Sequence, residues 1–397
     1  MSQGSAEHLT IEPLSYHRAL VAYLKAHEPE VWAWASAQKT RDDYQQQVRS
    51  ELLRDTYRLE PDAHPDVYAS LRLAMQRLGV EAPATLYQAG SQQMNASLVF
   101  VPGEIHVVLQ GQILERLGED ERLALFGHEV AHYLLWLRDS GDYHVADRIL
   151  CDALAARQAS ASHAETLRRY SLHTELFADR AGALAAQSVA AAVSTLVKVE
   201  TGIANPDPAA YLRQATEIDS GRGKRSAART HPENVVRARA LDLWWRGEPE
   251  LDEWVAEKLC GPLVLNALDL PDQLRLTAMT RGFLAYFLTD ASVRAEPLLN
   301  QARHLFPDWR DDEPAVTPAA FREARVDASV LDYLNALMLD LSLVDADTQD
   351  AALLRTYQVA RELDSVEALQ TNLKRDARLG RRELDKLKKK ADTVVAA

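Results

Sequence analysis

A helix with an apolar face is predicted over residues 123–136. Leucine, valine, alanine and phenylalanine recur there at three- and four-residue spacing, which is the period of a helix buried on one side. His128, Glu129 and His132 lie within this apolar segment. Because unpaired histidine and glutamate side chains are costly to bury, their presence in an apolar helix indicates that they have a function there.

The segment before this helix combines helical and strand patterns. Residues 10–55 have largely helical spacing, and residues 66–78 form a further predicted helix that ends at Gly79. Short apolar runs between turn residues predict strands over residues 84–88, 97–101 and 105–109. A small β-sheet is therefore expected beside the helices.

The segment after the central helix is first polar and alanine-rich, over residues 139–173. Residues 181–197 then form the longest uncharged stretch of the chain. This stretch falls short of the roughly 20 strongly apolar residues that a membrane helix needs. We predict that it is the buried continuation of a helix carrying Glu175.

Beyond residue 248 the chain has the pattern of successive amphipathic helices without a fixed repeat period. They are expected over residues 251–259, 271–288, 293–305, 318–326, 331–343, 348–363 and 366–390. The whole pattern predicts a mainly α fold with a small β-sheet, an α+β core followed by an all-α C-terminal domain. The expected parts are an N-terminal helical segment (1–60), a core domain (61–245) and a helical docking or regulatory domain (246–397).

Composition narrows the class of protein. The 397 residues are enough for a sizeable core, and 47% hydrophobic with 26% charged residues is ordinary for a globular protein. The net charge of −13 argues against a general nucleic-acid binder, because phosphate neutralisation needs a basic surface. We therefore expect no nucleic-acid partner.

Cysteine usage and the N-terminus indicate the compartment. Cys151 and Cys260 are distant in sequence and lack metal-type spacing, which fits a reducing environment. No basic segment followed by an apolar one is visible at the N-terminus, so no secretory signal is expected. We predict a soluble protein of the bacterial cytoplasm, without membrane insertion.

The sequence His128-Glu129-Val-Ala-His132 is typical of a catalytic metal site. Histidines four apart on a helix share one face, so both imidazoles can hold one zinc ion. Glu129 follows the first of them and can act as general base on a zinc-bound water. The alternative is an amphipathic helix whose histidines lie on its solvated face.

A third ligand is predicted downstream, in the segment His173-Thr-Glu175-Leu-Phe-Ala-Asp179. Glu175 and Asp179 share one helix face by the same spacing. A carboxylate from a second helix would complete a three-ligand site with a fourth position open for water, and Asp179 would orient a ligating histidine. The alternative is a solvated acidic face. A metzincin arrangement fails because Leu135 and Arg138 stand where Gly and His are needed.

These motifs, taken together, resemble those of the HtpX/CAAX-prenyl-endopeptidase type of gluzincin. The similarity rests on Asn95-Ala96, the apolar segment 101–109, the two metal-type motifs, and Thr230-His231-Pro232 followed by Arg237. It covers roughly residues 60–245 and implies a zinc metallopeptidase core. The chain departs from the family in lacking membrane helices, and residues after 245 match nothing in the peptidase core.

The resemblance implies a role for each motif residue. His128, His132 and Glu175 would bind one Zn²⁺ per chain, Glu129 would be the base, and Asp179 would lie behind a ligand. The strand Ile105-His106-Val107-Val108 would be an exposed sheet edge on which an extended substrate pairs. The alternative is an interior strand.

His231 and Arg237 keep several interpretations. His231 would donate a hydrogen bond to a developing oxyanion, bind zinc in a resting form, or simply begin a helix. Arg237 would steady Glu175 or the substrate, or be an ordinary surface arginine. The basic loop 219–229 would be a lid or a plain surface loop.

We therefore predict a soluble zinc-dependent endopeptidase that acts on protein or peptide substrates. Glu129 would take a proton from a zinc-activated water and return it to the leaving amine. The alternative is a latent or non-catalytic metal-containing adaptor. In that case the C-terminal helices bind a regulatory protein partner.

Overall fold

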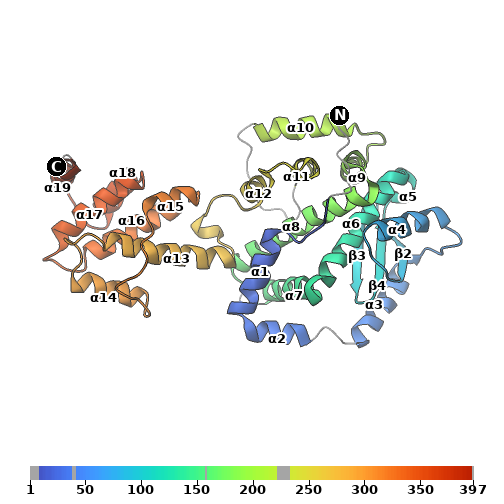
Figure 1. Cartoon of the computed structure of the whole chain (residues 1–397), viewed down its shortest axis with the longest axis horizontal. Coiled ribbons are helices and arrows are strands. Elements are labelled where there is room, and N and C mark those ends of the chain that lie inside the picture. The colour runs from blue at the N-terminus through green and yellow to red at the C-terminus, as the bar shows by residue number, and fades with distance from the viewer. Residues whose placement is uncertain (1–8, 38–41, 157–158, 221–232, 396–397) are drawn as a thin grey trace. The chain divides into compact units, whose positions relative to one another are not determined.

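The structure is a computed structural model in which the chain forms two compact units, Met1–Cys260 and Gly261–Ala397. Both units are mostly helical in the parts that the structure describes (Figure 1). The three-part division expected from the sequence stays a prediction. The described residues are 9–37, 42–156, 159–220 and 233–395.

The first unit combines helices with a small sheet. Its strands are β1 (Tyr57–Arg58), β2 (Ala84–Ala89), β3 (Asn95–Val101) and β4 (Glu104–Gln110). Its helices are α1 (Ser15–His27), α2 (Pro29–Ala37), α3 (Asp42–Asp55), α4 (Pro65–Arg77), α5 (Ile113–Arg116), α6 (Glu119–Leu137), α7 (Asp142–Ala155), α8 (Ala161–Ala186), α9 (Val189–Thr201), α10 (Pro208–Ser220), α11 (Asn234–Arg246) and α12 (Leu251–Val255).

The four strands form one mixed sheet in the order β1-β2-β4-β3. β4 pairs in parallel with β2, through Ile105 and Ala84, and antiparallel with β3, through Val107 and Leu98. The prediction that the strand Ile105-His106-Val107-Val108 is an exposed edge is therefore wrong. Its strongly apolar sequence reflects an interior strand that is covered on both sides. Among the described residues, β3 is the edge of the sheet on that side.

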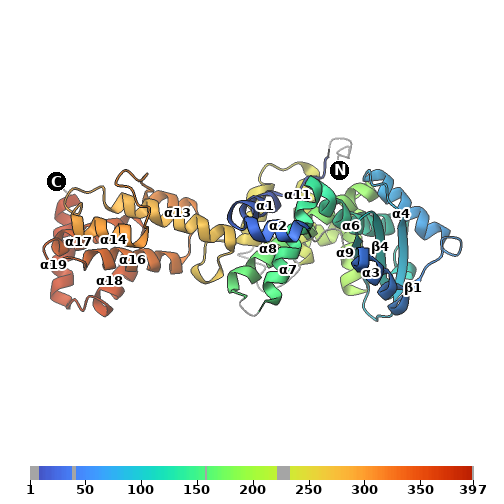
Figure 2. The same cartoon turned by 90° about the horizontal axis from the view of Figure 1, so that it is seen from below.

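Helices cover both faces of the sheet. Side chains at alternate positions of β4, among them Ile105 and Leu109, join the core formed with α4 and α6. Val108 points to the other face and packs with Val48 and Leu52 of α3. Figures 1 and 2 show α3 beside the strands, away from α4. The sheet is thus a layer between helices, with α6 packed along it.

A second core forms where α1 and α7 pack on α8. It contains Leu20 and Leu24 of α1, Tyr143 of α7, and Tyr170 and Phe177 of α8. This core lies on the side of α8 that does not carry Glu175. α1 and α7 thereby pack against the face of α8 opposite Glu175.

The expected continuous helix over residues 181–197 is wrong. α8 ends at Ala186, because Gln187 has a positive φ of 55° and closes the helix in the left-handed conformation. Ser188 then accepts a hydrogen bond from the Ala191 N–H and begins α9. Two helices with separate directions therefore replace one long one.

The second unit has its own apolar core, to which each of its helices contributes. The expected helix over residues 366–390 is wrong, because the segment from Asp376 to Gly380 separates two helices. The helices are α13 (Leu270–Phe287), α14 (Glu296–Leu305), α15 (Pro318–Glu323), α16 (Ala328–Ser342), α17 (Gln349–Glu362), α18 (Val366–Arg375) and α19 (Arg381–Val395).

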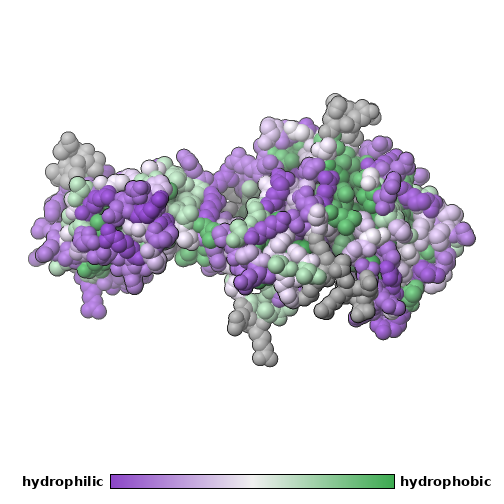
Figure 3. Space-filling view, turned by 60° about the horizontal axis from the view of Figure 1, so that its bottom comes forward, coloured by the Kyte–Doolittle hydropathy of each residue, from purple (hydrophilic) through white to green (hydrophobic). Residues whose placement is uncertain are grey.

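None of the described helices combines the length and the apolar character that crossing a membrane requires. The face of the molecule in Figure 3 is largely hydrophilic, with hydrophobic residues gathered mainly on part of the first unit.

Candidate metal centre

The start of α6 is anchored, and this anchoring positions the residues downstream. Gly118 precedes the helix, and its N–H donates to Glu121 in the first turn at 2.8 Å. Glu121 also accepts from Lys198 at 2.7 Å, and Ser194 of α9 donates to the same carboxylate. A carboxylate in the first turn is favoured by the helix dipole. The contacts thus hold α6 and α9 in fixed register.

Two glycines let α6 and α8 approach closely. A Cβ atom on Gly127 would lie 2.4 Å from the Ala185 Cβ, and one on Gly182 would lie 2.7 Å from the Ala124 carbonyl oxygen. Both distances are too short for real side chains, so only glycine fits at this crossing. The close approach brings His128 on α6 within reach of Glu175 and Asp179 on α8.

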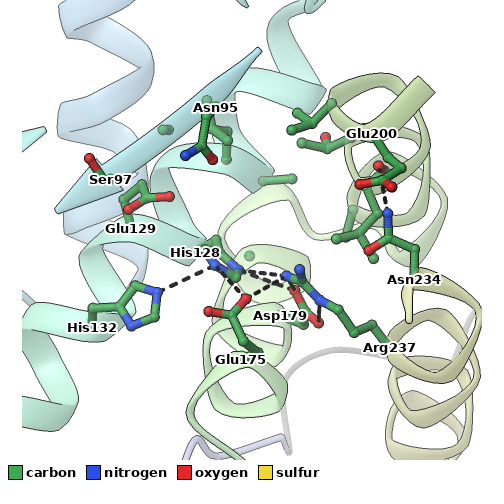
Figure 4. A pocket seen from close by; sticks show the side chains of 18 of the residues that line it. Asn95, Ser97, His128, Glu129, His132, Glu175, Asp179, Glu200, Asn234 and Arg237 are labelled. Atoms are coloured by element: carbon green, nitrogen blue, oxygen red, sulfur yellow. Dashed lines mark hydrogen bonds and ion pairs between the residues drawn. The ribbon is translucent and has the colours of Figure 1, made fainter. Parts of the chain in front are cut away.

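Ligand atoms of His128, His132 and Glu175 all lie within 4.8 Å of one another. The two Nε2 atoms of the histidines are 3.4 Å apart, and His128 Nε2 is 3.6 Å from Glu175 Oε2. Figure 4 shows the two imidazoles of α6 and the carboxylate of α8 pointing toward one another. The structure therefore brings together the three residues that the sequence singled out.

The donor set fits zinc. Tetrahedral ligands at about 2.0–2.1 Å from a zinc ion are about 3.3–3.4 Å from one another. The separations of 3.4 and 3.6 Å from His128 Nε2 to His132 and to Glu175 are close to that value. Two imidazole nitrogens and one carboxylate oxygen are also the ligands that catalytic zinc sites use. All three side chains line a cavity of about 1160 Å³, from which a substrate could reach an ion that they held.

Two charged residues, Asp179 and Arg237, orient His128 on the side of its Nδ1 atom. Its Nδ1 lies 3.1 Å from Asp179 Oδ1, and Arg237 donates to both oxygens of Asp179, at 2.8 and 2.6 Å. A proton on Nδ1 leaves Nε2 free as a ligand. Burial opposes protonation of His128, but Asp179 and Glu175 outweigh it, so the pKa of His128 is raised.

Arg237 also lies 3.2 Å from Glu175 Oε2. It therefore bridges the predicted ligand Glu175 and the orienting Asp179. Burial would raise the pKa of Asp179, but the charge of Arg237 reverses this and holds it below its usual range. Arg237 thus keeps Asp179 charged and able to accept from His128.

His132 has a different environment from His128. Burial, together with the neighbouring His128, lowers the pKa of His132 to about 4. The imidazole is therefore neutral near pH 7, which is the form that binds a metal. Trp136 lies one turn further along α6, with its ring centre 6.1 Å from that of His132.

Glu129 lies beside the three candidate ligands but is more deeply buried than the two histidines. Its side chain is buried, and burial is the main reason that its pKa is raised to about 7. A backbone hydrogen bond with Leu98 of β3 acts in the opposite direction. Since a carboxylate accepts, the Leu98 N–H points toward Glu129 and away from β4. A carboxylate with a pKa near neutrality suits a group that takes and returns a proton.

The remaining predicted residues lie elsewhere. His106 on β4 is buried and bonds Glu104 at 2.9 Å and Tyr87 at 3.3 Å, away from the ligands. Ile105, Val107 and Val108 pack in the cores on either side of the sheet. His231 lies outside the described residues, so its role stays a prediction.

Several residues that line the cavity were not predicted as site residues. Asn95 and Ser97 of β3 lie above the ligands, and Glu200 with Asn234 lies on the side of His128 opposite His132 (Figure 4). The asparagine of the Asn95-Ala96 pair was noticed only as part of a family motif. Asp147 of α7 lines the cavity as well. A lone acid in a polar segment carries no sequence signal that would reveal it.

Comparison with known proteins gives one family and one relative. Residues 63–245 match the model described as Peptidase family M48, and this range contains all three ligand candidates. The chain is also similar to the plastoglobule-localized metallopeptidase 48, chloroplastic, of Arabidopsis thaliana. The two are 30% identical over 206 residues, which cover 46% of this chain and 57% of that protein. No solved structure matches the chain.

The family match supports a metallopeptidase domain within the first unit. The narrower similarity to the HtpX/CAAX-prenyl-endopeptidase type stays a prediction. The chain spans little more than half the length of the plant protein, whose name places that protein at plastoglobules. The expected bacterial cytoplasmic location of this chain is therefore not shown.

Proposed function

We propose that this chain is a zinc-dependent endopeptidase. The observation that carries the proposal is the convergence of His128, His132 and Glu175, from two helices, at separations that suit one zinc ion. Glu129 lies beside them, and an open cavity faces them. The peptidase family match over residues 63–245 supports the same activity.

A zinc ion held by these three residues would supply Lewis-acid chemistry for hydrolysis of a peptide bond. The side chains of the protein provide the proton transfers and the orientation. Glu129 takes a proton from the attacking water and gives it to the leaving amine, for which its raised pKa is suited. Asp179 and Arg237 keep His128 in its ligating tautomer throughout.

The edge strand β3 offers a place for the substrate backbone. Residues Asn95 to Leu98 line the cavity, and β3 pairs only with β4 among the described strands. The N–H of Leu98 points away from β4, and by the alternation of a strand so do those of Ala96 and Phe100. An extended peptide can pair with such an edge independently of its side chains. β3 thus takes the role that the sequence assigned to residues 105–108.

Glu129→Gln tests the activity most sharply. The substitution keeps size and polarity but removes the base, so we expect zinc to be retained and turnover to fall by roughly 10²- to 10⁴-fold. Turnover would be measured by mass spectrometry of peptides released from a denatured protein mixture. The same preparation would be analysed for metal content.

Glu119→Gln is the matched control, because Glu119 is exposed in the first turn of the same helix. We expect it to cleave like the wild-type protein. If neither protein produces peptides that the Glu129→Gln protein lacks, the chain is not an active endopeptidase. The adaptor function, with a partner bound by the C-terminal helices, would then be the better account.

A further inference from the structure

Asp147 lines the candidate active-site cavity. Among the described residues, no hydrogen bond or ion pair to its carboxylate is found, although His132, Glu175 and Ser171 line the same cavity. Burial, not a neighbouring charge, sets the pKa of Asp147, and raises it to about 6. A partly buried carboxylate with no counter-charge is costly unless a ligand supplies one. The position of Asp147 therefore indicates a cationic ligand.

Asp147 lies at a definite end of the cavity. Trp136 follows His132 by one helical turn on α6, and Ser171 precedes Glu175 by one turn on α8. The ring of Trp136 is 5.7 Å from that of His144, which lies one turn before Asp147 on α7. Trp136 and Ser171 therefore lie about one helical turn beyond the candidate ligands, and α7 brings Asp147 to the lining of the same cavity. We call Trp136, Asp147 and Ser171 the Asp147 subsite.

The Asp147 subsite has an aromatic wall that reaches the edge strand. Phe100 of β3 packs edge-on against Trp136, with ring centres 5.1 Å apart. The indole Nε1 of Trp136 is buried and has no hydrogen-bond partner among the described residues. A peptide paired with β3 would therefore pass the subsite, since Phe100 belongs to that strand and Trp136 to the same helix as Glu129.

The charge of the Asp147 subsite indicates which kind of substrate side chain it can bind. The described cavity lining contains one lysine or arginine side chain, Arg237, and it is already engaged by Asp179 and Glu175. Asp147 therefore has no cation of the protein to face in the described part of the cavity. An aromatic ring beside a carboxylate suits a long cationic side chain, whose stem packs on the ring while its charge reaches the acid.

We propose that the Asp147 subsite binds a lysine or arginine side chain of the substrate close to the scissile bond. This inference rests on the proposed endopeptidase function and adds the substrate class. The carboxylate of Asp147 accepts hydrogen bonds from the cation, and the ring of Trp136 covers the aliphatic stem. Asp147 is thus a specificity-determining residue.

The first test is the cleavage pattern of the full-length zinc-loaded protein on a library of proteome-derived peptides. We expect lysine and arginine to be enriched at one position near the cleaved bond. Glu129→Gln protein, purified in parallel, removes the contribution of contaminating proteases with the same preference. Cleavage without any basic preference would overturn the inference and leave the proposed function standing. An absence of cleavage that depends on Glu129 would instead overturn the proposed function.

The second test compares two peptides that differ only by lysine or methionine at the preferred position. For the wild-type protein we expect kcat/KM to favour lysine, and Asp147→Asn should reduce this ratio by roughly tenfold or more. Asp147→Glu keeps the charge and should retain a preference for lysine. Asp147→Lys should turn the preference toward a glutamate peptide.

Asp152→Asn is the matched control, since Asp152 lies on the same helix but is exposed. It should keep the wild-type ratio. An unchanged ratio in Asp147→Asn protein that still binds zinc would overturn the inference. If Asp147→Asn protein does not fold, the ratio in Asp147→Glu protein decides, because loss of the lysine preference there contradicts a charge-based subsite.

Discussion

Two groups of histidines lie on different sides of α8, and they have opposite surroundings. His128 and His132 face Glu175 and Asp179, whereas His17 of α1 packs against His173 in the core behind the helix. His173 and Glu175 are two residues apart and therefore point in nearly opposite directions from the axis of α8. One helix thus separates a metal-type histidine pair from a structural one.

His17 and His173, which we call the structural pair, have uncharged hydrogen-bond partners. The Leu14 N–H donates to His17 Nδ1 at 3.2 Å, and His17 Nε2 lies 3.1 Å from the hydroxyl of Thr174. His173 Nδ1 donates to the carbonyl oxygen of Arg169 at 2.7 Å, and its ring stacks on Tyr16. Burial lowers the pKa of both imidazoles, to about 4 for His173. No carboxylate is among these partners.

Acidic partners, and not burial, distinguish the candidate ligand His128 from the two core histidines. Burial acts on all four imidazoles, but Asp179 and Glu175 reverse its effect at His128. A carboxylate behind the ring fixes which nitrogen is bare, while a second carboxylate shares the site.

Asp179→Asn should weaken zinc binding by roughly 10- to 100-fold, the usual effect of losing a group that orients a ligating histidine. The change also removes the negative charge that engages Arg237. Zinc affinity would be measured by competition with a chromophoric chelator. Asp152→Asn serves as control, and an equal loss in both variants, or none in Asp179→Asn, would contradict the role of Asp179.

The structural pair should make the fold sensitive to acid. The folded-state pKa of His17 lies well below its ordinary value of about 6.5, so the unfolded chain binds the proton first. Stability from the neutral imidazole is therefore complete above pH 6.5 and is lost as the pH falls below it. The loss from one such group is at most about 1.4 kcal/mol per pH unit.

The measurement is urea unfolding between pH 7.5 and 5, with a chelator present so that metal binding does not contribute. His17→Gln removes the titrating group, and we expect a shallower fall of the unfolding free energy than in the wild-type protein. Parallel curves for the two proteins would show that His17 has no part in the acid sensitivity.

The residues that converge at the candidate metal centre were easier to predict from the sequence than the strand order, for a physical reason. His128, His132, Glu175 and Asp179 were found by helical spacing, which is a local property of the chain. Which strand lies at an edge depends on pairing between distant segments, so the most apolar strand, β4, was mistaken for the exposed one. Apolar sequence is more typical of an interior strand.

Helix ends and solitary residues were harder to predict. The boundary between α8 and α9, at Gln187 and Ser188, lies inside an uncharged stretch of sequence. Ser188 was the one residue there whose type is typical of a helix start. His17 and Asp147 lie in segments with no motif around them, and their surroundings come from helices far away in sequence. Contacts between segments that are far apart in the sequence leave no local pattern in a single sequence.

The most direct test of the account is the zinc content of the dialysed protein, measured by elemental analysis for the wild-type protein and two variants in parallel. We predict one zinc per chain for the wild-type protein and for His17→Gln, and much less for Glu175→Gln, because only the last loses a ligand. A full zinc content in folded Glu175→Gln protein, or none in the wild-type protein, would contradict the central claim that side chains from α6 and α8 hold the metal together.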